Sequence, residues 1–285
     1  MLGIFDSGLG GLTVARHVRE QLPDEDLLYF ADQAHVPYGD KSVDELRGYL
    51  QANIAYLQAQ GVEAIVMGCN TSCAIAAQFG YPAAGVPILD LIEAAAQAVA
   101  QSGARRVGVI ATSATVRTGA YGAAIARLAP RAVVQEVAAP ALVPLVESGH
   151  RSGPLARAAV AQACSAFAGP LDALVLACTH YPLLDAEFAA VLGAATQRID
   201  PSVAQAQRAV VFVQEQLAQR RAHRVGTGRT RYVTSGDLHA FRENLREIVG
   251  ASDDVEEAEE DVHRGEAEQR PGNDLQSRVS FEIHT

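Results

Sequence analysis

Two nine-residue segments with the same pattern, 109 residues apart, constrain the fold of this chain more than any other feature. Residues 63–71 and 172–180 each read acid, Ala, three large apolar residues, a small residue, Cys and two polar residues. An apolar run of this length that leads into a helix-like stretch is typical of a buried parallel strand. The repeat therefore predicts two similarly built halves, with Cys69 and Cys178 each at the carboxyl end of a strand.

Strand-like and helix-like segments alternate along the body of the chain, which predicts an α/β fold with mostly parallel sheets flanked by helices. We expect strands at residues 2–5, 27–30, 63–67, 86–89, 106–111, 132–137, 172–176, 196–199 and 230–234. We expect helices near residues 11–21, 43–59, 72–79, 91–101, 119–128, 141–147, 154–167, 183–192, 202–219 and 238–248.

The repeat divides the chain into two pseudo-symmetric lobes with the active site expected between them. We assign residues 1–92 and 205–250 to the first lobe and residues 93–204 to the second. From residue 251 the alternation fails, and residues 251–285 carry 11 Asp or Glu against 3 Arg. Such a segment has little apolar surface to offset the entropy of ordering, so we expect a disordered acidic tail.

Composition narrows the class of protein. The net charge of −10 comes mostly from the tail, so the body is nearly neutral and does not favour nucleic acid or an anionic membrane as a partner. Four cysteines without paired spacing predict neither a disulfide framework nor a metal site. No window resembles a signal peptide or reaches the roughly 20 apolar residues of a membrane span. We therefore expect a cytoplasmic enzyme.

A glycine-rich loop, residues 5–12, follows the first expected strand and precedes a helix. Its amides could bind a carboxylate or phosphate. The dinucleotide fingerprint fits poorly, because position 13 is Thr and Asp6 would repel a pyrophosphate. Asp6 is better interpreted as an orienting carboxylate or a receiver of a substrate ammonium, with a turn-capping role as the alternative. Residues 35–42 follow the second strand, where Pro37 would stiffen a turn that holds Tyr38 and Gly39 against a ligand.

The two cysteine loops combine a thiol with hydrogen-bonding side chains at a helix start. The helix field there favours a thiolate, and a modest lowering of the usual thiol pKa of about 8.5 would make a useful base. His180 could assist Cys178 in proton exchange. Buried packing is the competing interpretation of any single cysteine. Cys–His nucleophilic catalysis is another, although it leaves the second thiol unused.

Several motifs in order resemble those of the glutamate racemases, a cofactor-independent family of amino-acid racemases. They are Phe5-Asp6-Ser7-Gly8-Leu9-Gly10-Gly11, Pro37-Tyr38-Gly39, Cys69-Asn70-Thr71, Cys178-Thr179-His180-Tyr181-Pro182 and, in between, Thr112, Thr115, Gly119-Ala120-Tyr121 and Glu147. Thr234-Ser235-Gly236-Asp237 also falls in the family's order. The resemblance covers about residues 2–250.

The resemblance implies that Cys69 and Cys178 are two acid/base thiols on opposite faces of the substrate. Asp6 and His180 would each assist one thiol, and Glu147 would lie near His180. The implied substrate-binding residues are Asp6, Ser7, Pro37, Tyr38, Gly39, Asn70, Thr71, Thr112, Thr115, Thr179 and His180. No cofactor or metal is implied, and a homodimer is expected. The expected activity is interconversion of L- and D-glutamate, which supplies D-glutamate for peptidoglycan.

Three other functions stay open at this level. One is racemisation of aspartate or a broader set of amino acids, because one methylene is worth only about 1–3 kcal/mol in a pocket. Another, from a different class, is a cysteine hydrolase or lyase with a single nucleophile. The third is a non-catalytic binding protein, which the presence of both thiols disfavours.

Overall fold

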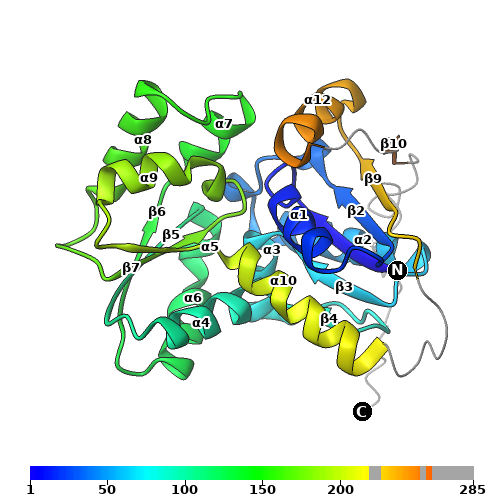
Figure 1. Ribbon diagram of the computed structural model, residues 1–285, viewed down its shortest axis with the longest axis horizontal. Helices are drawn as coiled ribbons and strands as arrows, with labels where there is room; N and C mark the ends of the chain where they lie inside the picture. Colours follow the sequence, from blue (N-terminus) through cyan, green and yellow to red (C-terminus); the bar gives the residue numbers. More distant parts are fainter. Residues whose placement is uncertain (218–225, 251–254, 259–285) are drawn as a thin grey trace, which may run out of the picture.

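Two β-sheets, each made of parallel strands, form the frame of the molecule (Figure 1). The computed structural model describes residues 1–217, 226–250 and 255–258. The first sheet has the strand order β10-β9-β2-β1-β3-β4, and the second has the order β6-β5-β7-β8. The first contains β1 (Leu2–Asp6), β2 (Leu27–Ala31), β3 (Ala64–Met67), β4 (Ile88–Leu89), β9 (Thr230–Thr234) and β10 (Val255–Glu257). The second contains β5 (Arg106–Ala111), β6 (Val133–Ala138), β7 (Ala173–Ala177) and β8 (Gln197–Ile199).

The internal repeat of the sequence is also a repeat of topology. In the first sheet β1 lies between β2 and β3, with β4 outside β3, and in the second sheet β5, β6, β7 and β8 repeat that order. Every strand pair is parallel. The chain order therefore reverses at β1 and at β5, and the carboxyl ends of β1 and β3, and of β5 and β7, become the sites where such sheets bind ligands.

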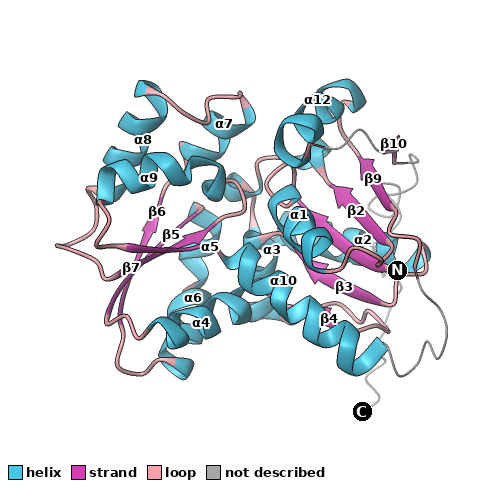
Figure 2. Cartoon of the chain, viewed as in Figure 1, coloured by secondary structure: helices cyan, strands magenta, loops and turns pink. Residues whose placement is uncertain are grey.

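Helices cover both sheets and account for the rest of the described body (Figure 2). They are α1 (Leu12–Gln21), α2 (Val43–Ala59), α3 (Asn70–Phe79), α4 (Leu91–Ser102), α5 (Ser113–Thr118), α6 (Ala120–Leu128), α7 (Leu142–Glu147), α8 (Pro154–Cys164), α9 (Asp185–Leu192), α10 (Pro201–Phe212) and α12 (Leu238–Val249). Short turns of 3-10 helix form η1 (Gln33–His35), η2 (Tyr38–Asp40) and η3 (Tyr181–Leu184), and η4 (Val213–Leu217) is a π turn. None of the described helices is long and apolar enough to cross a bilayer.

The predicted elements agree with the structure except at a few ends. All nine expected strands and all ten expected helices are present, and Ser42 caps α2 through a reciprocal bond with Glu45. The expected helix at 154–167 stops at Cys164, and the one at 202–219 becomes a π turn after Phe212, with residues 218 and 219 outside the described part. Helix α5 was not predicted, because six residues rich in Ser and Thr give only a weak helical signal.

Alternate residues along the strands of the second lobe face two different hydrophobic cores. Val107 and Val109 of β5 pack into a hydrophobic core continuous with that of the first sheet. Ile110 and, on β7, Leu174 and Leu176 face a separate cluster under α7, α8 and α9. This alternation is that of a sheet buried on both faces, which explains the near-continuous apolar runs in the sequence.

The chain returns to the first sheet after the second. Strand β9 pairs with β2, and β10 pairs with β9. The lobe boundaries at residues 92 and 205 stay predictions. The expectation of a disordered tail from residue 251 is wrong for residues 255–257, since these form β10 and Val255 is buried. Its three-residue length and acidic neighbours hid this strand, and residues 251–254 and 259–285 lie outside the described part.

Candidate active site

The two repeated cysteines face one small cavity between the lobes. Cys69 is the N-cap of α3, and Cys178 follows β7; their side chains are 3% and 5% exposed. The cavity has a volume of about 20 Å³. That space suits roughly one water molecule, so the lobes are closed in this structure and must separate to admit an amino acid. The cavity is lined by Ser7, Val36, Pro37, Tyr38, Gly39, Cys69, Asn70, Thr71, Thr112, Val143, Cys178, Thr179 and His180.

A chain of three side chains supports Cys178. His180 Nδ1 lies 3.7 Å from Cys178 Sγ, and His180 Nε2 lies 2.5 Å from Glu147 Oε1. Burial acts to lower the pKa of His180, but the hydrogen bonds to Cys178 and Glu147 outweigh it and hold that pKa well above its usual value. Burial acts to raise the pKa of Glu147, and the bond to His180 brings it below its usual value. An imidazolium held by Glu147 therefore places positive charge beside the sulfur of Cys178.

Cys69 has a different environment. Burial, followed by the negative charge of Asp6, raises the pKa of its thiol to about 12, although Ser72 and Ser7 oppose this by hydrogen bonding. The sequence analysis expected a lowered pKa from the helix start. At Cys69 the loss of solvent outweighs the helix field, because a buried thiolate beside the acidic Asp6 is poorly stabilised. The resting site therefore holds Cys69 as a neutral thiol.

Asp6 lies at the end of β1, and its carboxyl group accepts hydrogen bonds from amides of the glycine loop. Gly8 N and Gly11 N donate to Asp6 Oδ2 at 3.0 and 2.9 Å, and Thr179 Oγ1 donates to Oδ1 at 3.2 Å. Burial raises the pKa of Asp6, while His180 and these donors lower it. The amides of Gly8 and Gly11 thus bind the carboxyl group of Asp6, which belongs to the same loop. They do not form a binding site for a phosphate.

The glycines also allow the lobes to approach each other closely. A Cβ atom added at Gly10 would lie 2.5 Å from Thr179 Oγ1 and 2.7 Å from His180 Nδ1. A Cβ at Gly8 would lie 3.0 Å from Glu147 Oε1. The loop of the first lobe therefore rests directly against the catalytic turn of the second, and any larger residue would hold the two apart.

Hydroxyl groups from both lobes gather on another side of the cavity. Thr71 Oγ1 lies 3.0 Å from Thr112 Oγ1, which lies 3.0 Å from Thr115 Oγ1. Thr112 also caps α5 by accepting from the Thr115 amide. Tyr121 of α6 donates its hydroxyl to Asn70 Oδ1, so the Asn70 amide NH2 is left to face other partners. These groups form a set of donors suited to an α-carboxylate.

The structure brings together every residue named from the sequence. Asp6, Glu147 and Thr115 do not line the cavity but hydrogen bond to Thr179, His180 and Thr112, which do. Sequence reasoning missed Val36 and Val143 as lining residues and Asp32 as a supporting one, and it placed Tyr121 in a motif without giving it a role in the site. Asp32 follows β2 as Asp6 ends β1, and that shared place at strand ends was the available signal.

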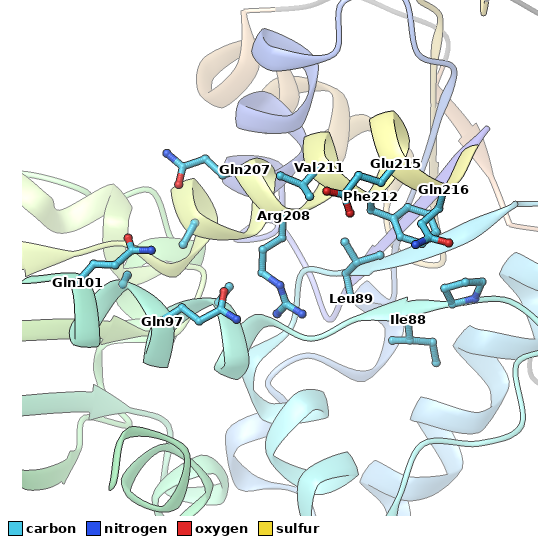
Figure 3. Close-up of a pocket in the computed structure, with 14 residues that line it drawn as sticks. Ile88, Leu89, Gln97, Gln101, Gln207, Arg208, Val211, Phe212, Glu215 and Gln216 are labelled. Atoms are coloured by element: carbon cyan, nitrogen blue, oxygen red, sulfur yellow. The ribbon is translucent and has the colours of Figure 1, made fainter. Parts of the chain in front are cut away.

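A larger groove of about 550 Å³ lies between α4 and α10, away from the thiols (Figure 3). Its walls carry Gln97, Gln101, Gln207, Arg208, Val211, Phe212, Glu215 and Gln216, and no nucleophile or general base is paired there. Size alone therefore does not locate the chemistry. In the described residues, no three His, Cys, Asp or Glu side chains gather as ligands for a metal ion.

Fold and site together define an α/β protein with two parallel-stranded sheets and one buried thiol from each half at a shared cavity, an arrangement that fits the cofactor-independent amino-acid racemases. The family model described as "Asp/Glu/Hydantoin racemase" matches residues 12–209, and this chain belongs to that family.

Within the family, the relatives of higher sequence identity are glutamate racemases. The glutamate racemase of Desulforudis audaxviator is 42% identical over 259 residues, which cover 87% of this chain and 93% of that protein. The structure of glutamate racemase from Francisella tularensis in complex with D-glutamate superposes with a TM-score of 0.82 at 30% identity, covering 90% of this chain and 95% of that one. The Thermus thermophilus glutamate racemase in complex with β-chloro-D-alanine gives 0.78 at 34% identity, covering 92% and 97%.

Proposed function

We propose that this protein is a glutamate racemase, an isomerase that interconverts L- and D-glutamate with two thiols and no cofactor. The observation that carries the proposal is the pair of buried thiols, one from each half of the repeat, at a single cavity. Identity of 42% to a glutamate racemase over most of both chains supports glutamate as the substrate.

The reaction needs one base and one acid on opposite faces of the α-carbon. For one enantiomer, the Cys178 thiolate takes the α-proton, and the electron pair of the broken C–H bond stays on carbon. The neutral Cys69 thiol then donates its proton to the other face and becomes a thiolate. The opposite enantiomer reacts by the reverse path, which starts with Cys69 as the thiolate and Cys178 as the thiol. Proton exchange with solvent restores the first state for another turnover in the first direction.

The α-proton of an amino acid is very weakly acidic, so the bases do not account for the rate alone. Donors placed around the α-carboxylate before reaction stabilise the negative charge as it develops. Thr71, Thr112, Thr115, Asn70 and the neighbouring amides supply them in this proposal. Asp6 and Thr179 would meet the substrate ammonium, with Ser7, Pro37, Tyr38 and Gly39 completing the pocket. Exclusion of water by the closed lobes strengthens each interaction.

The finer parts of the proposal concern the cell. D-Glutamate would feed peptidoglycan synthesis, which favours a cytoplasmic location where its precursors are assembled. A homodimer is the expected assembly. Elution volume with light scattering at several concentrations tests the dimer without involving the chemistry.

The decisive experiment is incubation with L-glutamate in deuterium oxide, followed by proton NMR and by separation of the enantiomers. We expect the α-proton signal to disappear while D-glutamate accumulates to an equal mixture. Parallel incubations with L-aspartate and L-alanine decide between glutamate and a broader substrate range. Absence of both exchange and inversion with glutamate would contradict the proposal.

A second function is worth testing because Cys178, His180 and Glu147 are aligned as in cysteine hydrolases, where a base and an orienting acid activate a nucleophile. That function predicts a covalent adduct on Cys178 when ester or thioester substrates are added. Intact-mass spectrometry after quenching separates the two functions, because proton transfer leaves the mass of the protein unchanged.

A further inference from the structure

We propose that Asp32 is a positioning residue that holds the segment Val36–Gly39 against the cavity, acting through the hydroxyl of Tyr38. We call this segment the strap. The inference rests on the proposed racemase function for its kinetic consequence, but its structural consequence can be measured without any turnover.

Asp32 is a buried carboxylate with an unusual number of donors. Only 1% of it is exposed, and it follows directly after β2. Tyr38 OH donates to Oδ2 at 2.5 Å, Ser235 Oγ donates to Oδ1 at 3.0 Å, and Asn53 Nδ2 lies 3.4 Å from Oδ2. His35 Nδ1 lies 2.9 Å from Oδ1. Several side chains therefore share one buried acceptor group, which makes Asp32 a strong anchor.

The anchor joins parts of the chain that are distant in sequence. Asn53 belongs to α2, and its amide also donates to Tyr38 OH at 2.9 Å. Ser235 follows β9, in the segment that returns to the first sheet, and falls in the Thr234–Asp237 motif that the chemistry leaves unassigned. Tyr38 itself is 2% exposed. Asp32 and Asn53 therefore hold the Tyr38 hydroxyl together, and Ser235 holds Asp32.

The strap that Tyr38 belongs to forms one wall of the thiol cavity. Val36, Pro37, Tyr38 and Gly39 all line it together with Cys69. A Cβ added at Gly39 would lie 3.0 Å from Cβ of Thr112 in the second lobe, and one at Gly8 would lie 3.0 Å from Cγ2 of Val36. The strap is thus wedged between the glycine loop and the second lobe, and a small shift would open the Cys69 side of the site.

Removing the carboxylate leaves the strap in place but weakens its hold. Asn at position 32 can accept from Tyr38 and Asn53 through the oxygen that replaces Oδ2, yet its NH2 would replace Oδ1 and face Ser235 and His35. Because about 1 Å of misplacement can cost a large factor in rate, we expect Asp32→Asn to lower kcat/KM by roughly tenfold, the equivalent of one charge-assisted hydrogen bond.

The test is a double-mutant cycle of Asp32→Asn and Tyr38→Phe, with Asp40→Asn as the control. Asp40 is exposed, lies next to the strap and undergoes the same chemical change. If Asp32 acts through the Tyr38 hydroxyl, the loss of kcat/KM in the double variant is no greater than the loss in the less active of the two single variants. Losses that add in full, or an unchanged kcat/KM in Asp32→Asn, would overturn the proposal.

A second readout is the rate at which iodoacetamide modifies Cys69, located by peptide mass spectrometry. Cys73 and Cys164 in the same chain serve as internal references, since both are buried and neither lines the cavity. We expect both variants to raise Cys69 labelling severalfold with the references unchanged, whereas a merely structural defect raises all of them together. If Asp32→Asn fails to fold, Tyr38→Phe alone decides, and unchanged Cys69 labelling in it overturns the proposal. A parent protein that does not racemise glutamate would reject the proposed function and leave this labelling result to judge the strap.

Discussion

At the residue scale, Cys69 and Cys178 occupy equivalent positions in the repeat but have different neighbours. Cys178 shares a hydrogen-bonded chain with His180 and Glu147, whereas Cys69 lies near the acidic Asp6 and has a pKa raised to about 12. In the proposed reaction Cys69 is therefore the proton donor, and Cys178, beside the imidazole, is the proton acceptor. Asymmetry of this kind is what a two-base reaction needs, since the two groups must start in opposite protonation states.

Replacing either cysteine by Ser should lower racemisation by ~10²–10⁴-fold or more, because a hydroxyl is a much weaker base than a thiolate. The remaining thiol should still exchange the α-proton of one enantiomer, a different one in each variant, and return deuterium to the same face. Chiral separation combined with NMR in deuterium oxide measures both. Cys164→Ser is the matched control, as that thiol is remote from the cavity. Wild-type turnover in Cys178→Ser would reject the two-thiol mechanism.

Glu147→Gln should destabilise the protein in a pH-dependent way. The folded-state pKa of His180 is raised, so its contribution is complete below the unfolded value of about 6.5 and is lost as pH rises through the higher folded value. The folded-state pKa of Glu147 is lowered, so its contribution is present above the unfolded value of about 4.3 and is lost as pH falls through the folded one.

The cost of Glu147→Gln should therefore be greatest near pH 6, on the order of 1.5–3 kcal/mol for a hydrogen bond between charged groups, and should shrink on going to alkaline pH. Urea unfolding of both proteins at several pH values measures it. In a His180→Gln background the same substitution should show little pH dependence. A cost that stays constant from pH 6 to alkaline pH would refute the charged pair.

At the scale of elements, the site is built from strand ends and the turns that follow them. β1, β3 and β7 deliver Asp6, Cys69 and Cys178 to the gap between the sheets, while the loop after α7 and helix α12 bring the lobes together elsewhere. Arg151, in the loop between α7 and α8, contacts α12 of the other lobe: Nη1 lies 2.7 Å from Glu247 Oε2, and Nη2 donates to Asn244. This pair favours the closed arrangement.

Arg151→Glu should raise KM by about 2- to 5-fold, since an ion pair with one exposed partner is worth up to ~1 kcal/mol and its reversal repels the lobes. Glu247→Arg in that background should restore part of the loss. Glu243→Arg, on the same helix but paired with His239, should not. Steady-state kinetics of the four proteins test this, and equal recovery by both second substitutions would argue against a specific cross-lobe pair.

The edge of the first sheet carries a further prediction at this scale. A chain ending at Ala258 keeps every described contact, whereas one ending at Gly250 loses β10, the burial of Val255 and the bond from Arg242 to its carbonyl. We expect the shorter chain to lose up to about 1.5–3 kcal/mol of unfolding free energy and to keep its turnover. Thermal melts and kinetics of both chains measure this, and equal melting temperatures would show that β10 adds nothing.

At the scale of the whole molecule, the closed lobes and the thiol chemistry are inseparable. A cavity of about 20 Å³ cannot hold glutamate, so each turnover includes an opening and a closing step. The chemistry between those steps is expected to use only groups of the chain itself.

Full activity should therefore survive dialysis against EDTA under reducing conditions, without addition of pyridoxal phosphate or nucleotide. Oxidation should abolish activity and dithiothreitol should restore it, because the thiolate is the reactive form. Racemisation assays before and after dialysis, with metal analysis of the protein, make the comparison. Activity that returns only with added metal or pyridoxal phosphate would contradict the two-thiol mechanism.

The sequence by itself determined the architecture, because local patterns encode it. Apolar runs of four to six residues separated by Ala-rich helical stretches specify buried parallel strands and their crossovers. The repeat around Cys69 and Cys178 then places both thiols at strand ends. The short helix α5 and strand β10 were not predicted from the sequence. Their few residues carry too weak a pattern, and both elements depend on neighbours for stability.

The tertiary structure alone decided what each of these residues does to the others. Three features depend on burial and on the contacts of the folded chain. Asp6 accepts hydrogen bonds from the amides of its own glycine loop, Cys69 is held as a neutral thiol, and Asp32 accepts a hydrogen bond from Tyr38. The free energy of a charge depends on the solvent and partners that remain around it. Those are properties of the assembled lobes, and no stretch of sequence contains them.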